Sequence, residues 1–342
     1  MQESTAITRQ RPEHGRGAAS SSQDPAIRVR GLAKLYRNPW TLKITRGVED
    51  LDFEVQRGEV MGYLGPNGAG KTTTLKLLAG LIKPTHGSAW LMGVPIEETR
   101  SRRQLGFLPE QPYFYDYLSG LEYLEMAGGL CGLGGHEAHQ RATHWLGRVG
   151  LGDRPRLLLR KYSKGMLQRL GLAAALVHEP EVLILDEPMS GLDPFGRRDV
   201  RELILEQRER GTTVLFSSHI IPDVEMLCDR AAIVLQGKLV RVATVAELVQ
   251  GGSQQVVITC AGRGVFEMPA SWQGRVTRRD RGAELDLEVH DHAHLQSVLA
   301  DVVRAGLEVR AVTPHRSSLE ELFMSTARGM APAESDPQRR TA

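Results

Sequence analysis

The stretch "GYLGPNGAGKTTTLKLLAG", residues 62–80, decides the fold. Strand-like apolar sequence, "EVMGYL", leads into it, and helix-like sequence with a stripe of leucines, "KTTTLKLLAGL", follows. Between them the residues satisfy the pattern G-x-x-x-x-G-K-[ST], in the strand–loop–helix context that this motif requires. The stretch therefore predicts a phosphate-binding loop at the start of a helix, in an α/β protein.

The residue types of this loop suit phosphate binding. Glycines let the backbone curl so that consecutive N–H groups face the phosphates, and the following helix directs its positive end at them. The lysine is predicted to reach the β- and γ-phosphates and the first threonine to bind Mg²⁺. A glycine-rich turn of purely structural role would need neither residue. The predicted nucleotide-binding residues are Gly65, Pro66, Asn67, Gly68, Ala69, Gly70, Lys71, Thr72 and Thr73.

A pair of carboxylates ends a second apolar run, "EVLILDEP". There Asp186 is predicted to hold Mg²⁺ through water and Glu187 to polarise an attacking water. Buried strands rarely end in two adjacent acids for packing alone, because an unpaired buried charge is costly. The alternative is a solvated strand end. Together with the phosphate loop, the pair predicts a nucleotide hydrolase.

One histidine ends a third strand-like run, "VLFSSHI". From such a position His219 can reach a γ-phosphate over the same sheet edge, because ligands bind at the carboxyl ends of parallel strands. A packed core histidine is the alternative. With the loop and the acid pair in place, we predict a catalytic role for His219.

Composition limits the class of protein. The chain has 342 residues, 41% of them apolar, enough to build one large domain or two ordinary ones. The net charge is +2 and acids and bases are interspersed, so no nucleic-acid partner is expected. Three scattered cysteines, without a CxxC pair, argue against disulfides or zinc and favour a reducing compartment. No apolar run approaches the ~18–20 residues of a membrane span, so we expect the chain itself not to cross a membrane.

Composition along the chain predicts five parts. Residues 1–26 and 329–342 are polar and without periodicity, as in disordered tails. In 27–250, short apolar runs alternate with helix-period segments, as in an α/β domain. Mainly helical patterning interrupts that domain at about 113–165, which predicts an inserted helical subdomain. In 253–328, the strand candidates "QQVVITC", "ELDLEVH" and "LEVRAVT" and helix candidates at 292–304 and 318–327 predict a small α+β domain.

A second anion site is predicted in "KYSKGMLQRLGLAAAL", residues 161–176. Ser163 lies at a helix N-cap position, in front of an apolar stripe of leucines. The unpaired N–H groups of such a helix end attract anions. One nucleotide has no obvious way to use both helix ends of one chain. The second site therefore suggests two protomers with ATP between them.

The order of the motifs resembles that of the ATP-binding-cassette (ABC) ATPases: "GPNGAGKT", "FLPEQP", "YSKGM", "LILDEP", "SGLD" and "SSH". The resemblance covers roughly residues 27–250 and implies a P-loop NTPase cassette that binds ATP and Mg²⁺. It implies that Ser163 and Gly165 of one protomer cap the γ-phosphate held by a second ABC cassette. Asp193, in "SGLD", is implied to act across the same seam. Tyr36 matches the aromatic residue that stacks on adenine, with Trp40 as an alternative.

Two departures from the family pattern are visible. The family's LSGGQ reads "YSKGM", with Lys164 and Met166 in place of glycine and glutamine, although the serine and the second glycine remain. The glutamine expected after "FLP" is Glu110, with Gln111 one place later. In an extended segment only one of these two side chains can face Mg²⁺, and we favour Glu110, because a carboxylate is also a ligand of that ion.

The resemblance implies transport as the use of ATP, through a separate transmembrane permease. The chain would then lie in the cytoplasm, on the inner face of the cell membrane. The aromatic run "PYFYDYL" follows the glutamine position, and Tyr113, Phe114, Tyr115 and Tyr117 would form a docking surface if exposed, or else pack the helical subdomain. The C-terminal extension looks like that of exporter cassettes. The alternative is a soluble non-transport ABC ATPase acting mechanically on a macromolecular partner.

Overall fold

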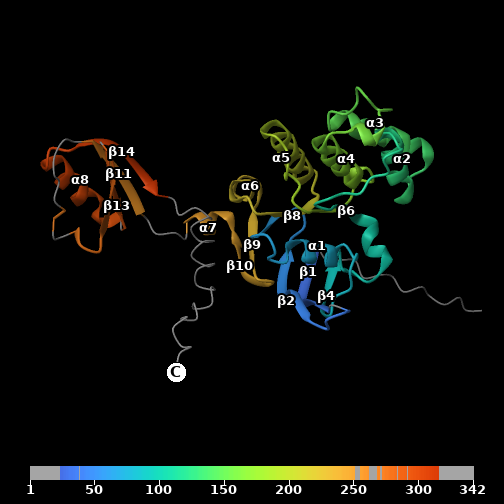
Figure 1. Cartoon of the computed structure of the whole chain (residues 1–342), viewed down its shortest axis with the longest axis horizontal. Helices are drawn as coiled ribbons and strands as arrows, with labels where there is room; N and C mark the ends of the chain where they lie inside the picture. Colours follow the sequence, from blue (N-terminus) through green and yellow to red (C-terminus); the bar gives the residue numbers. More distant parts are fainter. Residues whose placement is uncertain are drawn as a thin grey trace, which may run out of the picture.

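A computed structural model describes residues 24–37, 39–250, 255–261, 268–269, 272–282, 284–290 and 292–315. Most of the two predicted tails and the helix expected at 318–327 lie outside the described residues. The described parts form three sheets with their helices (Figure 1). Two sheets belong to the α/β part and one to the C-terminal part.

The central sheet carries the predicted motifs. Its strand order is β10-β9-β3-β8-β7-β6, parallel except for the edge pair β9–β10. Every residue of β3, β7 and β8 is buried, so these strands read as continuous apolar runs, as the sequence predicted. The strands are β3 (Val60–Leu64), β6 (Leu105–Leu108), β7 (Val182–Leu185), β8 (Thr213–Ser218), β9 (Arg230–Leu235) and β10 (Lys238–Thr244).

The strand order places the three motifs together. Strand β8 lies between β3 and β7, and all three run in the same direction. The residues that follow them are the phosphate loop after β3, the histidine after β8 and the acid pair after β7. Their carboxyl ends therefore meet at one edge of the sheet, where α/β sheets bind ligands.

A second, antiparallel sheet covers one face of the central sheet, and the sequence patterning predicted only the start of it. Its order is β2-β1-β4-β5, with β1 (Ile27–Arg37), β2 (Ile44–Val55), β4 (His86–Leu91) and β5 (Val94–Pro95). Buried residues alternate with more exposed ones in β2, since only one face of this sheet meets the core. Between the two sheets lies the short helix α1 (Lys71–Leu78), whose leucines join their shared core.

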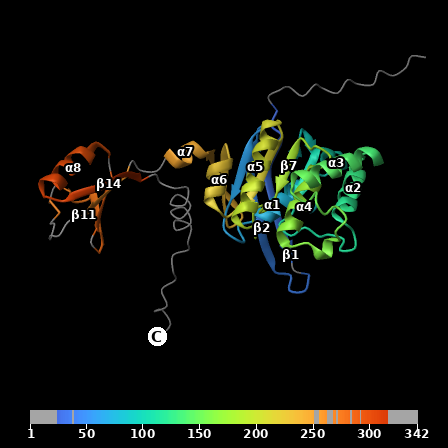
Figure 2. The ribbon, with the colours of Figure 1, turned by 90° about the horizontal axis from the view of Figure 1, so that it is seen from above.

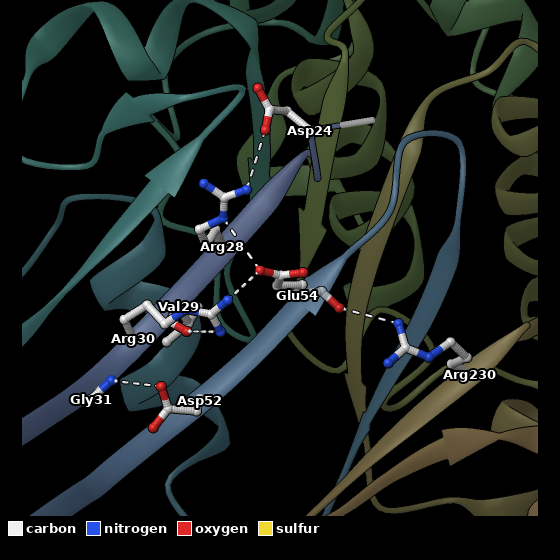
Figure 3. A network of polar contacts seen from close by, with 8 residues as sticks. All are labelled: Asp24, Arg28, Val29, Arg30, Gly31, Asp52, Glu54 and Arg230. Carbon is white, nitrogen blue, oxygen red and sulfur yellow. Dashed lines mark hydrogen bonds and ion pairs between the residues drawn. The ribbon is translucent and has the colours of Figure 1, made fainter. Parts of the chain in front are cut away.

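Polar contacts at the end of β2 join the two sheets (Figure 3). The Glu54 carboxylate accepts a hydrogen bond from Arg28 Nε at 3.3 Å and pairs with Arg30, both on β1. Its backbone carbonyl accepts from Arg230 Nη1, on β9, at 3.3 Å. One residue of the antiparallel sheet thus bonds to strands of both sheets.

Helices cover the other face of the central sheet. They are α4 (Lys164–Leu176), α5 (Pro194–Glu209) and α6 (Ile221–Leu227), with α7 (Val245–Gln250) after β10. The 3-10 helix η1 (Thr99–Gln104), before β6, contacts β5 of the antiparallel sheet as well as β6. Helices α2 (Gly120–Leu130) and α3 (Gly135–Arg148) occupy the segment where helical patterning was predicted, followed by η2 (Leu159–Lys161). They pack on each other and on α4, around Leu124 and Trp145.

The C-terminal part has its own sheet and core. Its strands are β11 (Gln255–Ala261), β12 (Val276–Arg281), β13 (Glu284–Val289) and β14 (Glu308–His315), in the order β12-β13-β11-β14. After η4 (His292–His294), α8 (Leu295–Arg304) packs Val298 and Val302 against the sheet. The predicted strands and first helix are confirmed, while β12, "VTRRDR", was missed because it is almost wholly charged. Figure 2 shows this part beyond α7, at the opposite end from α2 and α3.

Candidate nucleotide-binding site

A cavity of about 480 Å³ opens at the carboxyl end of β3. Most of its lining comes from the predicted nucleotide-binding residues, together with Glu110 and Glu187. Thr45, Arg46 and Gly47 also line it, and the sequence analysis missed them because they come from β2, in the sheet that it did not predict. The full lining is Tyr36, Thr45, Arg46, Gly47, Pro66, Asn67, Gly68, Gly70, Lys71, Thr72, Thr73, Glu110 and Glu187.

The loop has the curled backbone that its glycines predicted. Gly68 and Gly70 have φ angles of +81° and +100°, in the region that favours glycine. A Cβ on Gly70 would lie 2.7 Å from the carbonyl oxygen of Gly47, so a side chain there would clash with backbone. Two predicted loop residues, Gly65 and Ala69, are not in the lining: Ala69 is buried, and Gly65 packs against β9.

Lys71 is buried at the floor of the cavity and bonded to oxygens of its own chain. Its Nζ donates to the carbonyl oxygens of Gly65 at 2.7 Å and Pro66 at 3.2 Å. It also lies 3.2 Å from Glu187 Oε1, and both side chains are less than a tenth exposed. The lysine predicted to bind phosphate and the acid predicted to activate water therefore form a buried ion pair.

Ser217, on β8, holds the acid pair in place. Its hydroxyl donates to Asp186 Oδ1 at 2.7 Å and accepts from the Glu187 backbone N–H at 2.9 Å. Glu187 has a φ of +50°, a left-handed conformation that costs roughly 1 kcal/mol or more in a residue with a side chain. The sequence analysis missed Ser217, since its position beside Asp186 depends on the β7–β8 pairing, which a sequence pattern does not specify.

His219 completes a row of three charged or polar groups. Its Nδ1 lies 2.9 Å from Glu187 Oε2, and its side chain is 45% exposed. Glu187 thus contacts Lys71 through one oxygen and His219 through the other. The structure brings Lys71, predicted to bind phosphate, into contact with Glu187, one of the two residues predicted to be catalytic, and His219, the other, contacts Glu187 as well. No described residue forms a hydrogen bond with His219 Nε2, so that nitrogen can meet a ligand.

Three residues at this site carry oxygen atoms that could hold a hard cation, although Asp186, next to the lining residue Glu187, is not itself part of the cavity lining. Asp186 is fully buried, and its Oδ2 has no hydrogen-bond partner among the described residues. Thr72 and Glu110 line the cavity, whereas Gln111 is exposed and not part of the lining. Carboxylate and hydroxyl oxygens are ligands that Mg²⁺ accepts, so these three residues fit the ion.

Tyr36 lies at the outer side of the cavity. Its hydroxyl is 3.4 Å from Thr73 Oγ1, and the Lys34 ammonium lies 5.5 Å from its ring centroid. The ring lines the cavity and is 41% exposed, as a stacking surface for a base must be. Trp40, the alternative, is 91% exposed and is not part of the lining.

Ser163, Gly165 and Asp193 are not part of this cavity. Ser163 is the N-cap of α4, as predicted, with its Oγ accepting from the Met166 N–H at 3.3 Å. Asp193 caps α5 by accepting from the Gly196 N–H at 2.7 Å. The chain therefore has one phosphate loop and a separate helix end that its own cavity does not use.

Two arginines of α5 contact residues close in sequence to Asp193 and His219. Arg197 Nε donates to the Leu192 carbonyl at 3.3 Å, and Arg201 Nη1 lies 3.6 Å from Asp223 Oδ1, on α6. Burial raises the pKa of Asp223 although both arginines oppose the shift. An ion pair thus links α5, which Asp193 caps, to α6, which follows His219.

Comparison with known proteins identifies the family. Residues 48–190 match the sequence model of a family described as ABC transporter. An uncharacterized ABC transporter ATP-binding protein of Nostoc is 40% identical over 297 residues, 86% of this chain and 87% of the relative. The chain belongs to the ABC transporter family. The daunorubicin/doxorubicin resistance ATP-binding protein DrrA of Streptomyces peucetius is 35% identical over 308 residues, 88% of this chain and 92% of that protein.

Solved structures agree with this assignment. The cassette resembles the ATP-binding subunit of an ABC transporter at 32% identity, with a TM-score of 0.59 over 66% of this chain and 92% of that chain. It also resembles the dimeric bacterial ABC transporter cassette MJ0796 at 25% identity, with a TM-score of 0.60 over 64% of this chain and 98% of that one. The chain is therefore an ATP-binding, ATP-hydrolysing subunit of an ABC transporter, with the α/β cassette fold that the sequence predicted.

Removal of the Ser217 hydroxyl tests the support of the acid pair. We expect Ser217→Ala to lower kcat for ATP about tenfold and the free energy of unfolding by about 1–3 kcal/mol, since a buried carboxylate oxygen loses its donor. The neighbouring Ser218→Ala is the control, because Ser218 Oγ bonds only within its own turn. Steady-state turnover and chemical denaturation measure the two effects. Unchanged turnover in Ser217→Ala would show that Glu187 does not need this support.

Proposed function

We propose that two cassettes close around two MgATP and drive a separate transmembrane permease, as the ATPase of an exporter. The observation that carries the proposal is the division of the site. The phosphate loop and Glu187 line the cavity, while Ser163, Gly165 and Asp193 lie outside it, at helix ends of the same chain. A second protomer can supply these three groups to a nucleotide that the first one holds.

The chemistry follows from the contacts of Glu187. Lys71 is paired with this carboxylate, so bound phosphates would replace it as the partner of the ammonium. Glu187 is then free to accept a proton from the attacking water. His219 lies on the other oxygen of Glu187, where it can hold the γ-phosphate and respond to its loss.

The residues that fit Mg²⁺ are Thr72, Asp186 and Glu110. The ion would neutralise phosphate charge as the terminal phosphoryl group leaves. Asp186 is oriented for this task by Ser217, and its second oxygen remains available.

The aromatic run is the surface that we propose for the permease. Tyr113 and Tyr117 are 94% and 71% exposed, and Tyr115, 49% exposed, has its ring 5.8 Å from that of Tyr117. Such a cluster of exposed aromatic rings is typical of a protein interface. For Phe114 the alternative of packing in the helical subdomain holds. Its ring is 9% exposed and packs edge-on against Tyr123 at 5.0 Å, because the segment turns back onto α2 there.

The membrane partner has to be another polypeptide if transport is the function. Among the helices that the structure describes, none is both long and apolar enough to span a bilayer. Relatives named for resistance to daunorubicin and to linearmycin support export as the direction. We place the cassette on the inner face of the cell membrane, where ATP is available, bound to the permease through these tyrosines.

The test is purification of the chain from gently solubilised native membranes, followed by mass spectrometry. We expect a multi-span membrane protein at near-equal stoichiometry, and its loss by about tenfold or more in a Tyr113→Ser/Tyr117→Ser variant that still binds ATP. Leu130→Ser, which changes another exposed apolar side chain, on α2, is the control and should retain the partner. A wild-type chain without any membrane partner would instead favour the mechanical, non-transport ATPase.

A further inference from the structure

Lys164 has no role in the site described so far. It is the first residue of α4, directly after the N-cap Ser163, where the family motif has a glycine. Its side chain is exposed and makes no hydrogen bond or ion pair with any described residue. A long cation is thus placed at the positive end of a helix, where it is unfavourable unless an anion binds there.

The end of this side chain has a defined position. It lies against Gly191, in the turn "SGLD" (residues 190–193), and a Cβ on Gly191 would be 2.7 Å from Lys164 Nζ and 2.8 Å from Cε. Gly191 has a φ of +71°, so the turn favours glycine for its own conformation and also leaves room for the lysine. The ammonium therefore lies beside the turn that ends at Asp193, while its backbone belongs to the helix end of Ser163, and these are the two segments implied to meet a partner cassette.

The cations that line the cavity are already paired with acids. Its lining has two cationic side chains, Lys71 and Arg46. Lys71 is paired with Glu187 at 3.2 Å, and Arg46 with Glu49 at 2.9 Å. A triphosphate brings several negative charges to this cavity, so a further cation from the second protomer would complement them.

We propose that Lys164 of one protomer binds the γ-phosphate of the ATP held by the other. The inference rests on the proposed ATP-bound dimer. It assigns a charged contact with phosphate to a position where the family motif has glycine, which has no side chain to make one. Ser163 and the α4 N–H groups offer neutral donors, and Lys164 adds a charge-assisted one. The contact exists only while the γ-phosphate is present. It therefore makes closure selective for ATP over ADP.

The experiment measures ATP-driven dimerisation in a Glu187→Gln background by analytical ultracentrifugation. Lys164→Gln should raise the dimer dissociation constant by about tenfold for each of the two composite sites, or about a hundredfold overall, without changing ATP binding to the monomer. Lys164→Arg should retain most of the affinity because it keeps the charge. Lys161→Gln removes an exposed lysine just before the same helix and should have no effect.

Varying the ionic strength distinguishes an effect of the Lys164 charge from an effect of its packing on Gly191. The difference between Lys164 and Lys164→Gln should shrink as NaCl rises from about 0.05 M to about 0.5 M, because salt screens an exposed ion pair. Equal dimerisation of the two proteins at low salt overturns the proposal. So does a loss that salt does not change and that Lys164→Arg shares, since that result would mean a packing role.

Mixed dimers test whether the lysine acts on the partner's nucleotide. With Lys71→Ala in one chain and Lys164→Gln in the other, both changes fall in one composite site and the second site stays intact. With both changes in the same chain, each composite site carries one of them. We expect the first mixture to associate with ATP at least about tenfold more tightly, and the reverse order overturns action in trans. A Glu187→Gln chain that never dimerises with ATP would instead overturn the dimer itself, and Lys164 with it.

Discussion

We expect Glu187→Gln to lower steady-state ATP hydrolysis by roughly a hundredfold or more and to accumulate an ATP-bound dimer. The glutamine amide has nearly the shape of the carboxylate but cannot accept the proton of the attacking water, and general bases contribute about 10²–10⁴ in rate. The side chain is buried between Lys71 and His219, and an isosteric change keeps both neighbours in place. Chemistry is therefore removed while the binding groups remain.

The same substitution should strengthen ATP binding. Glu187 pairs with Lys71 at 3.2 Å, so phosphates have to replace a carboxylate as the partner of the ammonium. Glutamine removes this competition and also removes a negative charge next to the phosphates. A fluorescent ATP analogue measures the affinity, and size-exclusion chromatography with and without ATP measures the dimer.

Glu209→Gln is the matched control, because Glu209 is an exposed carboxylate at the end of α5. It should keep wild-type turnover and form no stable ATP-bound dimer. Undiminished hydrolysis in Glu187→Gln would remove Glu187 from its catalytic role. Lost hydrolysis without an accumulated dimer would keep the role but contradict the proposed closure around ATP.

The centre of the main sheet was predictable because its strands β3, β7 and β8 are buried on both faces and are mainly apolar. β7 and β8 are fully buried and stand out in the sequence for this reason. The antiparallel sheet was missed because only one face of β2 is buried, which dilutes the apolar signal. Because β2 was not predicted, the contribution of its residue Arg46 to the cavity was not predicted either.

The residues of the site were predictable wherever a local motif specifies the chemistry. Lys71 and the acid pair belong to such motifs, and the structure brings them to one edge of the sheet. Ser217 was missed because its function depends on the strand that lies next to it. The role of Phe114 was left open because the aromatic run "YFYDY", residues 113–117, does not show which ring turns inward. In both cases pairing between distant segments decides the outcome, and neither composition nor spacing contains that information.

The other large effect is expected from Lys71→Ala, which should lower ATP affinity by about a hundredfold or more and abolish measurable hydrolysis. The buried ammonium is the cation nearest the loop, and a charge-assisted contact with phosphate is worth about 1.5–3 kcal/mol before any effect on the transition state. No exposed lysine nearby can replace it, because its Nζ is positioned by the carbonyl oxygens of Gly65 and Pro66.

Stability distinguishes loss of the phosphate ligand from general damage. Lys71→Ala leaves Glu187 buried without its cation, so the free energy of unfolding should fall by about 3 kcal/mol. Adding Glu187→Gln removes the uncompensated charge. The double variant should regain most of the lost free energy of unfolding, but not ATP binding. Chemical denaturation of the two single variants and the double variant measures this cycle. Full ATPase activity in Lys71→Ala would contradict the phosphate-loop assignment. If the stability losses of the two single variants simply add in the double variant, the Lys71–Glu187 ion pair does not contribute to the stability of the fold.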